Sequence, residues 1–484
     1  MSKLPACTRH PRMGRWLVLA ALSASIGAHA QTPAITRPPQ KIEALGRDIL
    51  SELVAINSTQ AHGSTSAAQA MAARALAAGF LPADVNLLAP AAHPEKANVV
   101  VRLRGRGVGR AVLFIAHLDV VEARREDWTF DPFQLTEREG WLYGRGTIDM
   151  KGQAAAVLAN LIRLKQEGVV PEHDIIAAFT ADEEAGDANG VAWLFKEHRD
   201  LVDAALVVNP DGGEAAIKQG RKLYVGLQTS EKVYMTFALE ATDKGGHSSR
   251  PTADNPIYRL AAGLNRLAAF RFPVHLTDTT RLYFGRRAEI ESGSVQADMR
   301  ALLRTPPDPA AVGRLSSVVE TNVQMRTTCT ATMIEGGHAE NALPQRARAL
   351  VQCRVIPAES QESVAAAITA TLADPKIAVS VVSPATPAPD SPPTPAILAM
   401  LEQVTRSMWP GLVVLPEMSA GADDSIYTRA IGVPSYGIDG MFDDLDDGRA
   451  HGRDERIGVA AFAEELEFTY RLMRAIGDAP AQIR

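Results

Sequence analysis

The sequence of 484 residues predicts an α/β protein, in which a sheet covered by helices is interrupted by an inserted α+β domain. Short apolar runs of strand length alternate with amphipathic helical segments from residue 41 to residue 209. From about Gly226 onward, strands and helices alternate in the manner of an open α+β sandwich. After a stretch rich in Pro, Thr and Ala at 383–395, the first pattern returns.

Helices are expected where apolar residues recur at helical spacing, and strands where short runs are apolar or alternate with polar residues. The expected helices are 41–56, 65–78, 153–166, 191–202, 255–270, 308–325, 396–408 and 459–476. The expected strands are 98–103, 111–116, 174–180, 204–209, 232–240, 295–303 and 347–355. The simplest organisation is one domain built from residues 31–226 and 387–484, with residues 227–386 inserted as a second domain.

The first thirty residues are typical of a secretory signal peptide. Three arginines precede an apolar run at 16–27, which is too short to span a bilayer as a mature helix. Ala28-His29-Ala30 then forms a small-residue cleavage signature. We expect cleavage near Ala30 and a periplasmic or secreted protein; an uncleaved anchor or a buried helix is the alternative. No other segment is long and apolar enough to span, so no stable membrane association is expected.

Composition excludes several classes of protein. There are 56 acidic and 50 basic residues, and aromatic residues make up only 5%, so a nucleic-acid partner is not expected. Three cysteines are too few for a disulfide scaffold, and no Cys-x-x-Cys spacing exists for a cysteine-built zinc site. Any metal in this protein must therefore be held by histidines and carboxylates.

Residues that commonly bind metals follow the predicted strands 111–116, 174–180 and 204–209. They are His117 and Asp119, then Glu183 and Glu184, then Asp211. Two further candidates lie in loops before helices: Asp149 follows a Gly-rich turn, and His451 precedes the last helix. Adjacent carboxylates after a buried strand repel one another unless a cation is present.

Each of these residues also has an ordinary structural explanation. His117 suits a strand end, Asp149 a helix N-cap and Asp211 an Asp-Gly turn. The carboxylates at 182–184 suit a solvated loop, and His451 suits a loop before a helix. In an open α/β sheet, however, ligands bind outside the carboxyl ends of the strands. The convergence of all these residues on that edge favours one shared site.

Two histidines and three carboxylates suit zinc or a divalent ion of similar preference. One aspartate bridging two ions about 3.5–4 Å apart would form a two-metal hydrolytic site. Glu183 is left over from this ligand set, and it can serve as general base toward the attacking water.

These motifs resemble those of the metallopeptidase M20 family, which includes glutamate carboxypeptidase, aminoacylase, succinyl-diaminopimelate desuccinylase and carnosinase-like dipeptidases. The motifs are His117-Leu118-Asp119, Gly146 to Gly152, Asp182-Glu183-Glu184, Asp211 and His451, in the family's order. The resemblance extends from about Lys41 to Gly477. It implies a zinc-peptidase-like catalytic domain, with a mixed sheet flanked by helices, and an inserted lid or dimerisation domain.

The resemblance also implies roles for the individual residues. Two Zn²⁺ ions, or similar ions such as Co²⁺ or Mn²⁺, would be bound by His117, Glu184, Asp211 and His451, with Asp149 bridging them. Asp119 would orient His117. Glu183 would deprotonate the attacking water and then pass the proton to the leaving amine. The peptide bond after Asp149 is often cis in this family.

The inserted domain carries further similarity. The run Lys244-Gly-Gly-His247-Ser-Ser resembles the family's lid motif, so His247 would stabilise the developing oxyanion, in a partner subunit's site if the chain is a homodimer. Asn341 and Arg354 resemble residues that grip the substrate, and Gly421 lies in a loop similar to one near the substrate's carboxylate end. Asp423 departs from the family, where a small residue such as Thr is common, and adds negative charge near the expected pocket.

Cys329 and Cys353 lie on predicted strands that flank the Asn341 turn. A disulfide between them is therefore a hypothesis, which an oxidising compartment would permit.

The sequence thus predicts a secreted two-zinc metallohydrolase that cleaves an amide bond next to a free carboxylate, as a carboxypeptidase or dipeptidase. An N-acyl-amino-acid amidohydrolase is the alternative, because both kinds of substrate are amides of this type. A non-catalytic metal-binding protein is a remote alternative, since Glu183 and every ligand are present. The chain contains neither Gly-x-Ser-x-Gly nor His-Glu-x-x-His, which argues against a serine hydrolase and a one-zinc protease.

Overall fold

A computed structural model describes residues 37–386 and 388–479. The predicted signal peptide, residues 1–30, lies outside the described residues and stays a prediction. In the described part of the chain, no helix is long and apolar enough to cross a membrane.

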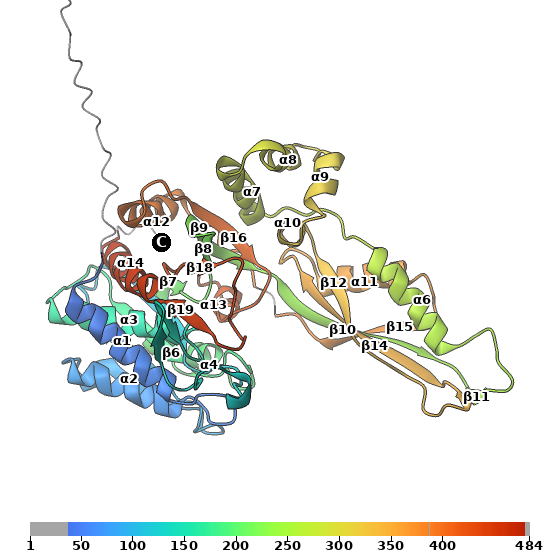
Figure 1. The fold of residues 1–484 in the computed structure, drawn as a ribbon, viewed down its shortest axis with the longest axis horizontal. Helices are drawn as coiled ribbons and strands as arrows, with labels where there is room; N and C mark the ends of the chain where they lie inside the picture. Colours follow the sequence, from blue (N-terminus) through green and yellow to red (C-terminus); the bar gives the residue numbers. More distant parts are fainter. Residues whose placement is uncertain (1–36, 387, 480–484) are drawn as a thin grey trace, which may run out of the picture. The chain divides into compact units, whose positions relative to one another are not determined.

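The larger sheet has ten strands in the order β1-β2-β6-β3-β7-β17-β9-β8-β18, with β16 paired to β9 (Figure 1). Its strands are β1 Val85–Leu88, β2 Asn98–Leu103, β3 Ala111–His117, β6 Ile175–Thr180, β7 Ala204–Asn209, β8 Ala215–Lys218, β9 Arg221–Glu231, β16 Val414–Ser419, β17 Ser435–Gly437 and β18 Asp443–Asp444. The pairs β3–β6, β3–β7 and β7–β17 are parallel, whereas β2–β6 and β8–β9 are antiparallel. The predicted mixed α/β sheet is therefore confirmed.

Helices cover both faces of this sheet, because its strands are apolar on both sides. Val99 and Val101 pack with α1 Gln40–Ala55, α2 Thr65–Ala77, α3 Lys151–Gln166, α12 Pro395–Met408 and α14 Val459–Gly477. Val100 points to the opposite face, in the core formed with α4 Gly190–Glu197 and α5 Arg199–Val202. A further helix, α13 Ser425–Ala430, contacts α4 and β7. The central strands are therefore buried on both faces.

A second sheet has four antiparallel strands in the order β12-β14-β10-β15. They are β10 Val233–Thr242, β12 Thr328–Gly336, β14 Arg346–Val355 and β15 Ile377–Ser383. Leu260 of α6 Pro256–Ala269 and Ile368 of α11 Gln361–Leu372 share a separate core with Phe237 and Val351. Strands from both sides of this segment enter the larger sheet, as an inserted domain requires. The boundary proposed at residue 226 falls within β9, which runs on to Glu231. The boundaries at residues 226 and 386 stay predictions.

Short elements complete the described part. Two strands near the predicted lid histidine, β11 Gly246–His247 and β13 Ala342–Leu343, pair with each other. Three strands form the sheet β19-β5-β4, namely β4 Thr136–Arg138, β5 Trp141–Tyr143 and β19 Arg456–Gly458. The 3-10 turns are η1 Pro82–Asp84 and η2 Arg125–Asp127.

One predicted strand is wrong: residues 295–303 belong to helix α8 Gly293–Leu302. Apolar and polar residues alternate there, which suggested a strand, but Met299 and Leu302 are buried at helical spacing. They pack with Tyr224 and Leu415 of the larger sheet. Helix α8 lies in a helical segment with α7 Asp278–Ile290, α9 Pro309–Leu315 and α10 Val319–Met325. The single helix predicted at 308–325 is thus two helices, and the helix predicted at 191–202 is divided into α4 and α5.

Cys329 and Cys353 are joined by a disulfide, which confirms the hypothesis drawn from the sequence. The two residues are direct partners in the β12–β14 register, 24 residues apart in the chain. Replacing both cysteines with serine is expected to lower the free energy of unfolding by about 2–4 kcal/mol, because the unfolded chain gains freedom. Urea titration checks this result. The native protein with dithiothreitol should behave like the double variant, and equal stability of all three samples would contradict the prediction.

Candidate metal centre

The candidate ligands lie where the parallel strands of the larger sheet end. His117 is the last residue of β3 and is in register with Thr180, the last residue of β6. The loop that begins after Thr180 carries Glu183 and Glu184, and the turn after β7 carries Asp211. These side chains therefore come together at one edge of the sheet, as ligands do in open α/β sheets.

Asp149 lies between the two histidines. Its Oδ1 is 3.0 Å from His117 Nε2, and its Oδ2 is 2.9 Å from His451 Nε2. Each histidine also faces a second carboxylate: Asp211 Oδ1 is 3.9 Å from His117 Nε2, and Glu184 Oε2 is 3.1 Å from His451 Nε2. Each oxygen of Asp149 thus faces one histidine, and each histidine also faces a second carboxylate. These are the two histidine–carboxylate pairs of the centre.

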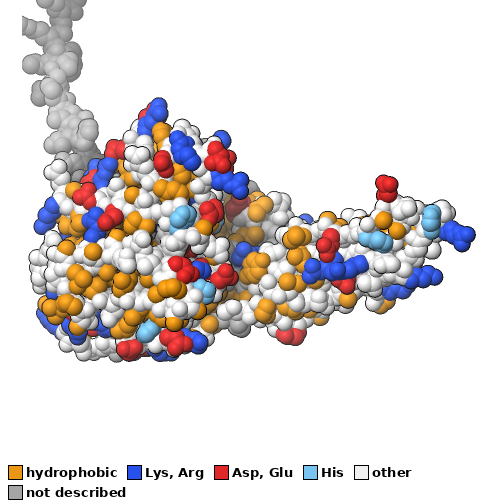
Figure 2. All heavy atoms as spheres, turned by 90° about the horizontal axis from the view of Figure 1, so that it is seen from below, with side chains coloured by type: hydrophobic (Ala, Val, Ile, Leu, Met, Phe, Trp, Pro, Cys, Tyr) orange, Lys and Arg blue, Asp and Glu red, His pale blue; other side chains and the backbone are white. Residues whose placement is uncertain are grey.

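The centre is partly buried and open on one side. His117 is 1% exposed and Asp149 21%, whereas His451 is 53% exposed. His451 has a φ of 61°, and the peptide bond between Asp149 and Met150 is cis, as the resemblance implies. On the face drawn in Figure 2, acidic and histidine side chains lie beside one another at the surface.

The turn that carries Asp211 depends on two glycines. Gly213 has a φ of 83°, and a Cβ there would lie 2.2 Å from the carbonyl oxygen of Gly437 in β17. A Cβ on Gly212 would lie 1.9 Å from Gln228 Oε1. The Asp-Gly-Gly sequence thus lets the backbone approach its neighbours closely enough to direct Asp211 toward His117.

Asp119 positions His117, Glu183 and Glu184 mainly through contacts with backbone groups, which the sequence did not indicate. His117 Nδ1 is 3.0 Å from the main-chain carbonyl of Asp119 and 3.8 Å from its carboxylate. The carboxylate instead accepts hydrogen bonds from the backbone N–H groups of Glu183, at 3.2 Å, and Glu184, at 3.0 Å. Asp119 therefore links His117 to the loop that carries both glutamates.

Asp182 is the member of the acidic run that does not face the histidines. Its carboxylate accepts a hydrogen bond at 2.7 Å from Lys96, and both side chains are buried. The φ of Asp182 is 64°, which turns the chain so that Glu183 and Glu184 can point the other way. Asp182 therefore fixes the loop. Among the described residues, no lysine or arginine forms an ion pair with Glu183 or Glu184.

Glu455 fixes the loop that carries Asp149. It is fully buried, and it accepts hydrogen bonds from Arg145 at 2.6 Å and from the backbone N–H groups of Gly146, Ile148 and Asp149 at 3.1, 2.8 and 3.3 Å. The pairing of β5 with β19 places Glu455 beside this loop. Glu455 was not among the residues predicted from the sequence, although it lies only four residues after His451.

Glu455→Gln is expected to weaken metal binding by about 10- to 100-fold, because outer-shell partners hold the ligands in place. Competition against a chelating dye measures this affinity. Glu467→Gln is the matched control, since it also disrupts a buried glutamate–arginine pair, with Arg163 at 3.0 Å, but one on α14. The prediction is wrong if both variants bind metal equally well.

Burial and like charges raise the pKa of three acidic residues at this centre, whereas the pKa of Asp149 is held below its usual value, against the effect of burial, by hydrogen bonds from His117 and His451. Burial raises the pKa of Glu183 to about 10; His117 opposes this shift and Asp211 adds to it. Burial also raises the pKa of Glu184 and of Asp211, and the Asp149 carboxylate raises both further. The hydrogen bond that His451 donates to Asp149 raises the pKa of His451 to about 9.

The donor set fits a divalent metal ion. A nitrogen of His117 and carboxylate oxygens of Asp149 and Glu184 lie within 4.8 Å of one another. Imidazole nitrogens and carboxylate oxygens are zinc-type ligands. A cation among these carboxylates would offset their repulsion and lower their pKa values.

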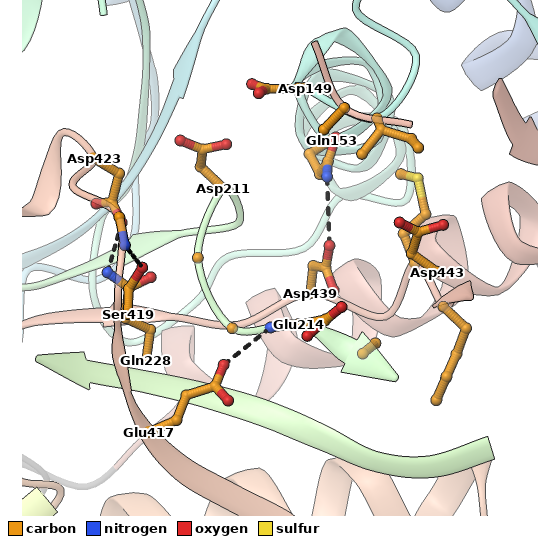
Figure 3. A pocket seen from close by; sticks show the side chains of 18 of the residues that line it. Asp149, Gln153, Asp211, Glu214, Gln228, Glu417, Ser419, Asp423, Asp439 and Asp443 are labelled. Atoms are coloured by element: carbon orange, nitrogen blue, oxygen red, sulfur yellow. Dashed lines mark hydrogen bonds between the residues drawn. The ribbon is translucent and has the colours of Figure 1, made fainter. Parts of the chain in front are cut away.

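A cavity of about 450 Å³ opens beside the centre (Figure 3). Asp149 and Asp211 line one end of it, and Gly421 and Asp423 line another wall. The Asp423 carboxylate accepts a hydrogen bond from Asn209 at 2.9 Å and one from Gln228 at 2.5 Å. Gly421 is thus the one predicted substrate-binding residue that lines this cavity.

The other predicted substrate residues lie elsewhere in this chain. His247 is exposed on β11, where its Nδ1 is 2.8 Å from Ser249 Oγ. Asn341 is exposed in the adjoining turn, and its carbonyl accepts a hydrogen bond from Ser248. Arg354 lies over the ring of Tyr234, 5.0 Å from the ring centre. None of the three lines the cavity.

Comparisons with known proteins identify the family of this chain. Residues 113–475 match the model of "Peptidase family M20/M25/M40". The human N-fatty-acyl-amino acid synthase/hydrolase PM20D1 is 28% identical over 383 residues, which cover 75% of this chain and 73% of that protein.

Solved structures share the fold. The M20 family metallo-carboxypeptidase Sso-CP2 from Sulfolobus solfataricus has a TM-score of 0.65 at 17% identity, covering 90% of this chain and 99% of that one. The Bacillus subtilis YXEP protein, a dinuclear metal-binding peptidase of the M20 family, has a TM-score of 0.57 at 12% identity, with coverages of 90% and 99%. The chain belongs to peptidase family M20/M25/M40, and it is an enzyme of the M20 metallopeptidase and amidohydrolase kind.

Proposed function

We propose that this chain is a secreted two-zinc hydrolase that cleaves an amide bond next to a free carboxylate, as a carboxypeptidase or dipeptidase. The observation that carries the proposal is the pairing of one histidine and one carboxylate on each oxygen of Asp149. N-acyl-amino-acid hydrolysis is the second candidate, favoured by the similarity to the human N-fatty-acyl-amino acid synthase/hydrolase.

The ligands divide into two sets that share Asp149. His117 and Asp211 would hold one ion, and His451 and Glu184 the other. Two such ions polarise a scissile carbonyl and make water a better nucleophile near neutral pH. The similarity in fold to the Bacillus subtilis YXEP protein, a dinuclear metal-binding peptidase, supports two ions rather than one. Zn²⁺ is the ion we propose, with Co²⁺ or Mn²⁺ as substitutes.

Glu183 acts as the general base in this proposal. Its backbone N–H is held by Asp119, and the described residues place no lysine or arginine within ion-pair distance of its carboxylate. It takes a proton from the attacking water and gives it to the leaving amine. Asp119 acts as a positioning residue, because its carbonyl orients His117 and its carboxylate holds the backbone of Glu183 and Glu184.

His247, Asn341 and Arg354 complete the site in a homodimer, in which the lid domain of one subunit serves the centre of the other. Their absence from the cavity of their own chain supports this role. The strand β12 lies at the edge of the lid sheet, and its Met333 and Ile334 are 65% and 66% exposed. An exposed apolar edge strand suits pairing with a second copy.

His247→Ala is expected to lower kcat by about 10²–10³-fold, as loss of an oxyanion donor does, with an unchanged melting temperature. Mixing this inactive variant with inactive Glu183→Ala should restore activity, because each mixed dimer regains one native site. Steady-state assays before and after mixing measure the recovery. Mixed dimers without activity would contradict a role in the partner's site.

A release assay tests the proposed function. Residues 31–484 are supplied with zinc or with a chelator and given dipeptides and N-acyl amino acids, each with a free or a blocked carboxylate. We expect chelator-sensitive release from the free-carboxylate substrates, absent in Glu183→Ala. Absence of cleavage for every substrate with two ions bound would favour the non-catalytic alternative. Secretion is tested separately, by sequencing the N-terminus of the exported protein, which should begin near Gln31.

A further inference from the structure

The cavity beside the metal centre is lined by carboxylates well beyond the predicted ligands. From Asp149 and Asp211 it reaches a group of four further acidic residues, with Trp141 and Phe442 among its apolar lining (Figure 3). The four are Glu214, Glu417, Asp439 and Asp443. No lysine, arginine or histidine is among the residues that line the cavity.

These four carboxylates act on one another; Arg287 offsets the charge of Glu214 and Glu417, and Arg449 that of Asp443, without forming an ion pair. None lies within 4.0 Å of a basic nitrogen in the described part of the chain. Glu417 accepts a hydrogen bond only from the backbone N–H of Glu214, at 3.2 Å. Burial and the neighbouring Glu214 carboxylate together raise the pKa of Glu417 to about 8. Glu214 also raises the pKa of Asp439, after burial and Glu465.

Three buried oxygens on the cavity lining have no hydrogen-bond donor. They are Gln153 Oε1, Gln324 Oε1 and Asp439 Oδ1, on side chains that are 4%, 9% and 8% exposed. The amide orientations are fixed, since Gln153 Nε2 donates to Asp439 Oδ2 at 3.4 Å and Gln324 Nε2 donates to the Met418 carbonyl at 2.7 Å. The free atoms are therefore all acceptors, which leaves the lining short of donors.

A ligand with hydrogen-bond donors and positive charge would pair the free acceptors and stabilise the ionised forms of Glu417 and Asp439, which burial disfavours. An ammonium or guanidinium group has both properties, whereas a carboxylate would be repelled. Under the proposed function, the amine half of the substrate carries the free carboxylate, which is disfavoured in the part of the cavity that Glu214, Glu417, Asp439 and Asp443 line. The acyl half, on the other side of the scissile bond, is left to occupy it.

We propose that this cavity binds the acyl half of the substrate through a cationic group, either the α-ammonium of an N-terminal residue or a side-chain ammonium or guanidinium. Asp439 and Glu417 are the principal acceptors. This proposal rests on the proposed function and narrows its class of substrates. It favours peptides with a free amino group over amino acids that carry an uncharged fatty acyl chain.

The test compares three substrates that share alanine as the amine half and six acyl carbons. They are norleucyl-alanine, 6-aminohexanoyl-alanine and N-hexanoyl-alanine. We expect kcat/KM for at least one aminated substrate to exceed that for the hexanoyl substrate by about tenfold or more, the effect of one charge-assisted hydrogen bond. The norleucyl and aminohexanoyl arms distinguish an α-ammonium from a side-chain ammonium. Equal or faster cleavage of hexanoyl-alanine overturns the proposal.

Two isosteric variants test whether the preference for aminated substrates arises in the cavity. Asp439→Asn and Glu417→Gln should each remove most of the advantage of the aminated substrates, measured as the ratio of their kcat/KM to that for hexanoyl-alanine in the same variant. Either variant suffices if the other fails to fold. Asp446→Asn is the matched control, because it removes one negative charge from an exposed side chain beyond β18, outside the cavity. An advantage that survives in both variants overturns the proposal.

Calorimetry distinguishes a failure of this cavity's proposed role from a failure of the proposed function. Metal-loaded Glu183→Ala is titrated with the same three compounds, so binding is read without turnover. Tighter binding of an aminated compound, lost on Asp439→Asn, supports the cavity's role even if the native enzyme cleaves none of the three. Equal binding of all three overturns it, even if the native enzyme cleaves them all.

Discussion

Replacing Glu183 with alanine is expected to lower kcat by at least about 10³-fold while metal content stays at the native level. Glu183 lies beside the predicted ligands but is not one of them, and its backbone is fixed by Asp119. The substitution removes the group that moves the proton and leaves both histidine–carboxylate pairs intact. Steady-state kinetics and elemental analysis of the same sample measure the two quantities.

Asp187→Asn is the matched control for this experiment. It changes an exposed carboxylate on the same loop, whose only hydrogen-bonding contact within the described part of the chain is with Gln60 at 3.4 Å. Its kcat should stay within about twofold of the native value, as surface changes do. Retention of most activity in Glu183→Ala would exclude its role as the base, and loss of metal would make it a ligand instead.

Replacing Asp149 with alanine is expected to remove the metal itself. Both of its oxygens face a histidine, at 3.0 and 2.9 Å, so it is the one carboxylate shared by the two proposed ligand sets. Without it, each set keeps one histidine and one carboxylate, which is too few for a stable zinc site. We expect less than one ion per chain after dialysis, together with loss of activity.

Asp447→Asn serves as the control, because Asp447 lies near His451 in sequence but is held by Arg449 at 2.9 Å and Arg456 at 2.7 Å. It should retain native metal content. Full occupancy in Asp149→Ala, measured by elemental analysis, would exclude Asp149 as the bridging ligand.

Local sequence was sufficient to predict the strands β2, β3, β6 and β7 of the larger sheet and the edge at which the candidate ligands meet. The apolar runs that end at His117, Thr180 and Asn209 are buried on both faces, so their pattern is strong and their ends are well defined. The chain supplies the ligand-type residues directly after those ends. Strand periodicity and motif order therefore carry most of this information.

Long-range contacts set the limits of prediction. Glu455 contacts a loop more than 300 residues earlier in the chain, and nothing in its local sequence indicates four hydrogen bonds. Gln153 and Asp439 meet on the cavity lining from α3 and from a segment beyond β17. Residues 293–302 alternate like a strand, yet tertiary packing against Tyr224 and Leu415 makes them a helix.

Removing the metal with a chelator and titrating zinc back tests most directly whether this centre performs the hydrolysis. Activity toward free-carboxylate amides should disappear on chelation and return with added zinc, reaching its plateau at two ions per chain. Asp149→Ala should recover nothing in the same titration. Activity that survives complete removal of metal, or full recovery at one ion per chain, would contradict a two-ion centre built around Asp149.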